Sequence, residues 1–445
     1  MTDTDPKPLM DRLLAQVARA GADAADLLYV RQTADSAQVR LGEVENTERA
    51  QSEELGLRVL VGRRQAAIAT SRMDDASLDD AADRAVAMAK AAPEDPYTGL
   101  ADRPGPAPSA RLDLDDGGDW QAADLTEAAR VAEAAARAVP GVTNSEGGHA
   151  SATRTQVALA TSTGFYGTYA GTRYGVSAVV LAGETSGMVR DYDYARRRHR
   201  ADLPDPETIG RCAGERAVRR LGAQKPGSAS LPVIFDRRVA KTLLGHLSQA
   251  VSGPAVARGT SFLKERKGER LFREGIRIID DPTLKKGLGS RPFDGETLPV
   301  SSLALIDDGV LTSWLLNLAS ARQLDLPPTG HASRGLSGPP GVSTSNFYLE
   351  AGDVTPDALI AQIDRGLYVT ELMGMGVNPV TGDYSRGAAG FLIEQGRLST
   401  PVHELTIASN LIDMFSRLTP ANDLVLDEPM AAPTVLIDTM TVAGA

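Results

Sequence analysis

The spacing of apolar residues predicts a helix near the start of the chain, followed by short strands and a second helix. In residues 7–20, Leu9, Leu13 and Val17 fall on one helical face. Alternating apolar and polar positions then predict strands, and helical spacing returns over 78–92. The predicted strands cover 25–32, 37–49, 56–61 and 65–71. The first unit is therefore expected to contain several strands between two helices.

The remaining pattern predicts two further units. An Ala-rich helix over 124–139 opens the second unit, and apolar or aromatic residues alternate with small polar ones over 152–197. Such long alternation with Gly-containing turns is typical of an antiparallel meander. The third unit contains a buried strand and two hairpin patterns, which turn at 307–309 and at 395–396.

Strands interrupted by unrelated helices, without regular strand-helix alternation, indicate an α+β fold rather than a doubly wound α/β fold. We expect mixed antiparallel sheets with flanking helices. Prolines and glycines over 93–108 are typical of an interdomain connection. We predict an N-terminal α+β domain over 1–105, a central β-meander domain with flanking helices over 106–225, and a β-rich C-terminal domain over 226–445.

Composition and charge argue against several classes of function and site, including nucleic-acid binding, membrane binding and Cys-rich zinc sites. The net charge of -11 argues against nucleic acid or an anionic membrane surface as a partner, since both attract clustered Lys and Arg. The one basic run, 196–200, is interpreted as a solvated strand end. A single cysteine, Cys212, excludes an intrachain disulfide and a Cys-rich zinc site. The sequence shows neither a signal peptide pattern nor a long apolar run, so we expect a cytoplasmic protein without a membrane partner.

The segment "TLLGHLSQAVSG" (242–253) has the pattern of a helix that could carry a metal. Apolar residues recur every four positions after Asp236, a suitable N-cap, and His246 lies close to this stripe. A catalytic zinc site needs about three protein ligands, and ligands on one helix must share a face. The neighbours of His246 include Gln249 and Ala250, and none is a good zinc ligand or general base. Local residues therefore favour a satisfied core or interface histidine.

Other candidate sites have simpler structural explanations. His403 and Glu404 begin like a zinc motif, but the alternation around them predicts a strand, which would place the two side chains on opposite faces. The paired carboxylates at 280–281 and 307–308 are interpreted as turn residues that accept from backbone amides. The other histidines, His149, His199 and His331, have no local Ser, Cys or Asp pattern that suggests a triad.

Several long segments, in order, resemble the TldD/PmbA family. They are "LLGHLSQAVSGPAVARGTSFLKERKGERLF", "GLGSRPFDGE", "LIDDGVLTSWLLNLASARQL" and "NPVTGDYSRGAAGFLIEQGRLSTPVHELTIASNLIDMF". The resemblance implies paired cytoplasmic metallopeptidase subunits that trim or degrade unfolded peptides, a family also labelled modulator of DNA gyrase. In the TldD-like subunit a His-Glu-x-x-x-His helix and a later cysteine complete the zinc site. This sequence lacks the His-Glu pair, the second His and the cysteine.

The resemblance therefore implies a PmbA/TldE-like subunit that holds no cofactor, with zinc in a TldD-like partner. Unfolded peptides are the implied substrates. By the same resemblance, Gly259, Thr260 and Ser261 lie near a shared cavity or subunit interface, as do residues 381–387. A loop that needs small residues explains 259–261 equally well.

Two alternatives remain open at the level of sequence. The chain could be a peptidase in its own right, with non-standard ligands such as His246, His331 or His403 brought together by folding. It could also be a homodimeric peptide-binding protein without hydrolysis, and a homodimer could form whenever the partner is absent.

Overall fold

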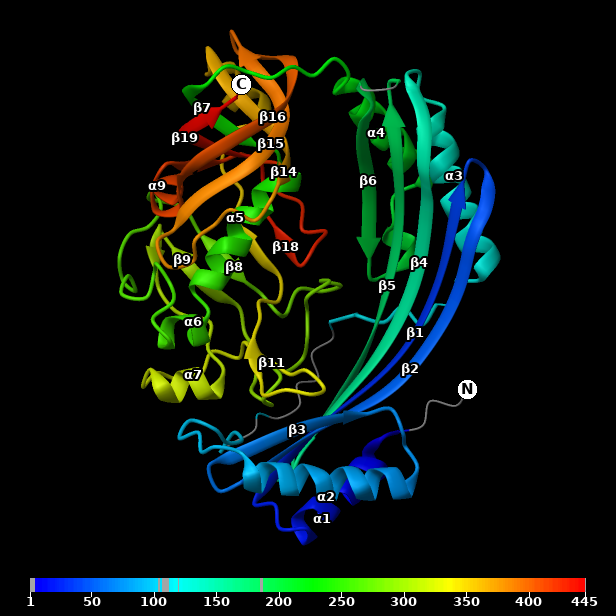
Figure 1. Cartoon of the computed structure of the whole chain (residues 1–445), viewed down its shortest axis with the longest axis vertical. Coiled ribbons are helices and arrows are strands. Elements are labelled where there is room, and N and C mark those ends of the chain that lie inside the picture. The colour runs from blue at the N-terminus through cyan, green and yellow to red at the C-terminus, as the bar shows by residue number, and fades with distance from the viewer. Residues whose placement is uncertain (1–4, 103–104, 106–111, 119, 185–186, 445) are drawn as a thin grey trace.

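The computed structural model describes residues 5–102, 105, 112–118, 120–184 and 187–444. In this part of the chain, a long curved sheet stands beside a C-terminal body built of shorter strands and helices (Figure 1). The α+β prediction is confirmed, with helices that flank antiparallel and mixed sheets.

The long sheet is antiparallel and has the order β3-β2-β1-β4-β5-β6. Its strands are β1 (Ala24–Arg40), β2 (Glu43–Val61), β3 (Arg64–Thr70), β4 (Val142–Thr161), β5 (Tyr166–Ala182) and β6 (Val189–Arg197). The short runs predicted before residue 62 merge into β1 and β2, because polar residues in their middle pair across the sheet as regularly as apolar ones. The meander begins at Val142, ten residues before the predicted start.

Two helix pairs cover opposite ends of one face of this sheet. The pairs are α1 (Lys7–Arg19) with α2 (Asp75–Ala91), and α3 (Ala122–Arg137) with α4 (Pro206–Arg219). In β1, Leu27 and Tyr29 pack beneath the first pair, while Ala37 and Val39 pack beneath the second. All four are separated by even numbers of residues along the strand, so their side chains point to one face of the sheet. The other face is turned toward the C-terminal body.

The C-terminal body contains a second six-stranded sheet and a smaller five-stranded one. The six-stranded sheet has the order β16-β15-β14-β7-β19-β17, and an additional pairing between β16 and β19 closes it. Its strands are β7 (Ala229–Phe235), β14 (Arg365–Met373), β15 (Asp383–Glu394), β16 (Arg397–Asn410), β17 (Leu418–Pro420) and β19 (Val435–Ala443). The five-stranded sheet, order β10-β9-β8-β13-β18, contains β8 (Ile278–Asp280), β9 (Leu303–Asp307), β10 (Val310–Leu311), β13 (Phe347–Leu349) and β18 (Met430–Ala431).

Short helices and one small hairpin complete this body. They are α5 (Arg237–Ala250), α6 (Gly253–Ala257), α7 (Leu318–Gln323), α8 (Pro356–Ala361), α9 (Leu411–Ser416), β11 (Ala332–Ser333) and β12 (Gly341–Val342). One continuous apolar core joins α5 to both C-terminal sheets, so the position of α5 is fixed by packing on several sides.

Both predicted hairpins are present. Asp308 and Gly309 have φ of 47° and 77°, and Gln395 and Gly396 have φ of 51° and 74°. Positive φ at both central residues is the pattern of a two-residue turn that matches strand twist. The turn interpretation is wrong for Asp280, which ends β8 and is fully buried.

The predicted boundary at residues 105–106 falls between strands that share one sheet, because β1 pairs with β4 over most of its length. Residues 103, 104 and 106–108 of the predicted connection over 93–108 lie outside the described residues. The division into three domains stays a prediction. In the described part of the chain, every helix is too short or too polar to cross a membrane.

Candidate functional site

Helix α5 lies at the centre of the candidate site. Its N-cap, Asp236, accepts a hydrogen bond from the Arg238 backbone N–H at 2.9 Å, as its sequence position predicts. The buried residues of α5 form the predicted stripe: Val239, Ala240, Leu243, Leu244, Leu247 and Ala250. His246 lies beside the stripe and is half-buried.

The His246 ring packs edge-on against Tyr384 of β15, with ring centroids 5.9 Å apart. Its Nε2 atom is buried and has no hydrogen-bond partner among the described residues. Burial lowers the pKa of His246, and the positive charge of Arg386 lowers that pKa further. Among the described residues the Nε2 nitrogen is not satisfied within the chain, and an interface role for the histidine stays a prediction.

The other two histidines considered as ligands have separate surroundings. His331 is buried, with Nε2 3.1 Å from Asp280 Oδ2 and Nδ1 2.9 Å from Thr329 Oγ1. His403 and Glu404 lie in β16 as predicted, but not on opposite faces, since Nδ1 of His403 is 3.7 Å from Glu404 Oε1. Glu404 has φ of 51°, which interrupts the regular alternation of the strand.

These residues do not fit a zinc ion. In the described part of the chain, no group of three or more His, Cys, Asp or Glu side chains could hold a metal. On α5, the positions one turn after His246 hold the exposed Gln249 and the buried Ala250. One neutral imidazole supplies a single ligand, whereas a catalytic zinc needs about three.

The loop 259–261 ends α6. The Gly259 N–H donates to the Val256 carbonyl and the Thr260 N–H to the Ala255 carbonyl, both at 2.9 Å, with Gly259 at φ 71°. This is the Schellman pattern that follows many helices. Ser261 is buried, and its hydroxyl donates to the Ala250 carbonyl at 2.6 Å. Gly259 and Ser261 thus have structural roles, Thr260 is exposed, and a substrate role for this loop stays a prediction.

The connection between β14 and β15, residues 374–382, lies next to this loop. The Phe262 N–H donates to the Pro379 carbonyl at 2.9 Å, and Arg386 Nε donates to the Gly374 carbonyl at 3.0 Å. Large apolar side chains on or beside the connection remain exposed, Met375 by 85% of its surface. The segment 381–387, singled out in the sequence, contains two residues that act on His246. Tyr384 packs against its ring, and the charge of Arg386 lowers its pKa.

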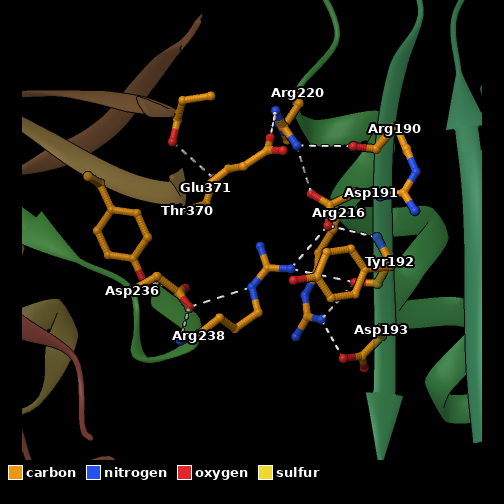
Figure 2. Close-up of polar contacts among 12 residues, drawn as sticks. Arg190, Asp191, Tyr192, Asp193, Arg216, Arg220, Asp236, Arg238, Thr370 and Glu371 are labelled. Atoms are coloured by element: carbon orange, nitrogen blue, oxygen red, sulfur yellow. Dashed lines mark hydrogen bonds and ion pairs between the residues drawn. The ribbon is translucent and has the colours of Figure 1, made fainter. Parts of the chain in front are cut away.

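A network of arginines and carboxylates joins α5 to the long sheet (Figure 2). At its centre Asp191 of β6, only 3% exposed, accepts from Arg238 Nη1 at 3.0 Å and from Arg220 Nη1 at 3.3 Å. Arg220 also pairs with Glu371 of β14. Burial alone would lower the pKa of Arg238, but the charges of Asp191 and Asp236 raise it overall.

Arg220 and a further arginine, Arg216, cap the outer edge of β6. The carbonyl oxygen of Arg190 accepts from Arg220 Nη1 at 3.1 Å, and that of Tyr192 accepts from Arg216 Nη1 at 3.3 Å. Side chains thus occupy edge carbonyls that could otherwise pair with another strand (Figure 2). Sequence analysis missed this network, because Asp191 and Arg238 are 47 residues apart and no local motif links them.

Three family models match the chain in order. They are described as PmbA/TldA metallopeptidase domain 1 (residues 25–89), central domain (115–221) and C-terminal domain (228–444). The chain is similar to metalloprotease PmbA of Escherichia coli O157:H7, with 35% identity over 96% of this chain and 94% of that protein. A PmbA homolog of Haemophilus influenzae shares 33% identity over 96% and 93%.

Two solved structures share the fold over nearly the whole chain. A protein of Bacteroides thetaiotaomicron described as a putative modulator of DNA gyrase superposes with a TM-score of 0.91 and 27% identity, covering 100% of both chains. TldE of Thermococcus kodakarensis superposes with a TM-score of 0.85 and 21% identity, covering 98% of this chain and all of the other. The second likeness concerns the fold alone.

Proposed function

Since this chain belongs to the PmbA/TldA metallopeptidase family, we propose that it is a zinc-free subunit of the PmbA/TldE type. In this proposal it pairs in the cytoplasm with a TldD-like subunit that carries the zinc ion. The pair processes or degrades unfolded peptides. This chain supplies part of the enclosing surface and no catalytic residue.

The observation that supports the proposal is the composition of α5. By the family resemblance, α5 corresponds to the helix that carries zinc ligands in a TldD-like subunit. It is capped and packed as a complete helix, but it offers one imidazole and no second ligand among the described residues. An intact helix with a deficient donor set is what a non-catalytic subunit retains when the partner performs the chemistry.

A second subunit also accounts for the exposed apolar side chains near His246. Met373, Met375 and Val380 are 45%, 85% and 53% exposed at the connection between β14 and β15. Neighbouring exposed apolar side chains of this size favour a contact with another protein surface. We propose that this connection contacts the TldD-like subunit.

The first test is elemental analysis for zinc on the purified, untagged chain alone. We expect far less than one zinc per chain. We also expect a reduced, unfolded protein substrate to be cut only when the chain is mixed with its TldD-like subunit. Near-stoichiometric zinc that survives dialysis, together with hydrolysis by the chain alone, would contradict the proposal.

Replacing His246 with Ala separates a structural role from a ligand role. Under the proposal, His246→Ala leaves the zinc content and the hydrolytic rate of the mixed subunits unchanged within about twofold, because the residue touches no metal. Loss of bound zinc from the mixture in this variant would show that His246 is a ligand. Size-exclusion chromatography of the chain alone and of the mixture tests whether it self-associates or pairs.

A further inference from the structure

Three arginines lie together on the face of the long sheet that is turned toward the C-terminal body. Arg173 belongs to β5, and Arg196 of β6 pairs with Gly175, two residues further along β5. Residues two apart on a strand share a face, so Arg173 and Arg196 point the same way. Arg198 follows β6 directly, and its side chain lies over Gly171 of β5. A Cβ added to Gly171 would lie 2.7 Å from Arg198 Nη1.

This face is covered at both ends but not over Arg173 and Arg196. At one end Tyr169 packs against Phe293, with ring centroids 5.6 Å apart. At the other end Lys241 Nζ of α5 donates to the Tyr194 hydroxyl at 2.9 Å. Arg173 lies four residues after Tyr169, and Arg196 lies two residues after Tyr194. Both arginines therefore lie between the two contacts with the C-terminal body, and both are exposed. Figure 1 shows β5 and β6 alongside the C-terminal body.

None of the three arginines pairs with a carboxylate in the described part of the chain. Arg198 donates to the carbonyl oxygens of Leu288, Thr172 and Gly287 at 2.8, 3.2 and 3.3 Å. The Arg196 guanidinium lies 5.2 Å from the centre of the Tyr194 ring. The Arg173 side chain makes no hydrogen bond or ion pair with a described residue.

Neighbouring carboxylates are already paired with other cations. Arg196 lines a cavity of about 70 Å³ between β6 and α5, which also contains three acidic residues. Their pairs are Asp193 with Arg216, Asp427 with Arg197, and Glu428 with Lys241. In a chain of net charge -11, three arginines on one face that have no counter-ion among the described residues are an unusual concentration of positive charge.

Burial and the charge of a neighbouring arginine lower the pKa of two of these groups, Arg173 and Arg198. Burial lowers the pKa of Arg198 to about 10, and the charge of Arg173 lowers it further. Burial also lowers the pKa of Arg173, with a contribution from Arg196. The interpretation of 196–200 as a solvated strand end is wrong for Arg198, because its guanidinium donates to three backbone carbonyls. The negative charge of an anion placed among the three groups would offset the repulsion between them and favour their charged form.

The surface beside the arginines is flat enough for a peptide backbone. Gly175 carries no side chain, and the facing residue of β4 is Ser151, whereas the Arg198 side chain lies over Gly171. Arg173 and Arg196 lie on neighbouring strands, which are about 5 Å apart. Along the strand direction they are offset by two residues, or about 7 Å. Alternate residues of an extended chain are also about 7 Å apart, so this spacing suits acidic side chains at alternate positions better than one small anion.

We propose that Arg173, Arg196 and Arg198 form an arginine site that binds Asp and Glu side chains of extended peptides lying across the sheet face. The inference rests on the proposed function, since it assigns acidic peptides as the preferred substrate class. Guanidinium groups bind carboxylates through paired, charge-assisted hydrogen bonds. Binding across a face also agrees with the capped edge of β6, where addition of a strand would displace Arg216 and Arg220.

The test compares two labelled, unstructured peptides of equal length, with Glu or Gln at the same alternate positions. Binding to the full chain is measured by fluorescence anisotropy, at low and at physiological salt. We expect about tenfold tighter binding of the Glu peptide at low salt, a smaller difference at higher salt, and no displacement by free glutarate at an equal carboxylate concentration.

Variants locate the site. Arg173→Gln and Arg196→Gln should each lower the preference for the Glu peptide about threefold or more, while Arg173→Lys retains part of it. Arg137→Gln is the matched control, because it removes one positive charge from an exposed position at the end of α3. We expect this control to bind both peptides as the wild type does. Circular dichroism and thermal melting check that each variant is folded.

Failure of this inference is distinguishable from failure of the proposed function. Equal binding of the Glu and Gln peptides by the wild-type chain would overturn the arginine site while leaving peptide binding intact. An unchanged preference in Arg173→Gln and Arg196→Gln would also overturn it. No binding of either peptide, by the chain alone or mixed with its TldD-like subunit, would overturn both.

Discussion

Glu296 is a buried carboxyl group whose protonation is set by its surroundings. It is 6% exposed, and its Oε2 atom accepts from the Leu318 backbone N–H at 2.7 Å. Burial raises the pKa of Glu296 from 4.5 to about 7, although the nearby charge of Arg58 opposes that change. The side chain lies where β1 and β2 meet the C-terminal body, beside Asp26 and Asp294.

This raised pKa predicts that stability falls as the pH rises from about 4.5 to about 7. In that window the folded chain holds a proton on Glu296 that the unfolded chain has released, and ionisation in the folded state is unfavourable. At about 1.4 kcal/mol per pKa unit, the difference reaches about 3 kcal/mol. Glu296→Gln keeps the acceptor for Leu318 and removes the titration.

Melting curves of both proteins across this pH range measure the effect. The variant should gain stability over the wild type as the pH rises toward 8, and the two should differ least near pH 5. A constant difference across the range would show that Glu296 does not titrate in this window.

Glycine has a different role inside helix α5 than at the end of helix α6. Gly259 follows α6 with φ of 71°, whereas Gly245 lies inside α5. A Cβ at position 259 would meet no atom within 4 Å, and one at 245 would meet only Met430 Sδ, at 3.8 Å. Space is therefore available at both positions, and backbone conformation alone distinguishes them.

The matched pair Gly259→Ala and Gly245→Ala tests this. We expect Gly259→Ala to lower the free energy of unfolding by about 1 kcal/mol, because a side chain in the left-handed region is strained. Gly245→Ala should raise it by about 0.5–1 kcal/mol, since Ala is the better residue within a helix. Denaturant titration measures both, and changes of the same sign would contradict the assignment of the α6 end.

Over the whole molecule, the ionic network around Asp191 holds the long sheet against α5. Its other members are Arg220 at the C-cap of α4, Arg238 of α5 and Glu371 of β14, so it connects elements that no short segment of sequence contains. Breaking a buried charge pair from one side leaves the opposite charges without compensation. The network should therefore contribute more than exposed ion pairs do.

We expect Asp191→Asn to lower the free energy of unfolding by about 3 kcal/mol, because Arg220 and Arg238 lose a shared buried counter-ion. The control Glu127→Gln breaks an exposed pair with Arg130 on α3 and should change it by less than about 1 kcal/mol. Urea denaturation compares the two variants. Equal effects would mean that the network is no more than a surface feature.

Several elements followed from the sequence because their causes are local. The stripe and Asp236 cap of α5, and the two hairpins with Gly at their second turn position, depend on residues within a few positions of one another. The α+β class and the resemblance to the TldD/PmbA family likewise followed from patterns that are continuous along the chain, and the similarity to known proteins confirms that family.

Only the tertiary structure decided how these elements meet. The pairing of β1 with β4 joins two sequence units in one sheet, and Asp191, Arg220 and Arg238 come together across distant segments. The interrupted alternation at Glu404, the burial of Asp280 and the lack of a partner for His246 Nε2 among the described residues also depend on neighbours that are remote in sequence. Burial and charge compensation are properties of the assembled surroundings, so a local pattern can identify a side chain but cannot fix its environment.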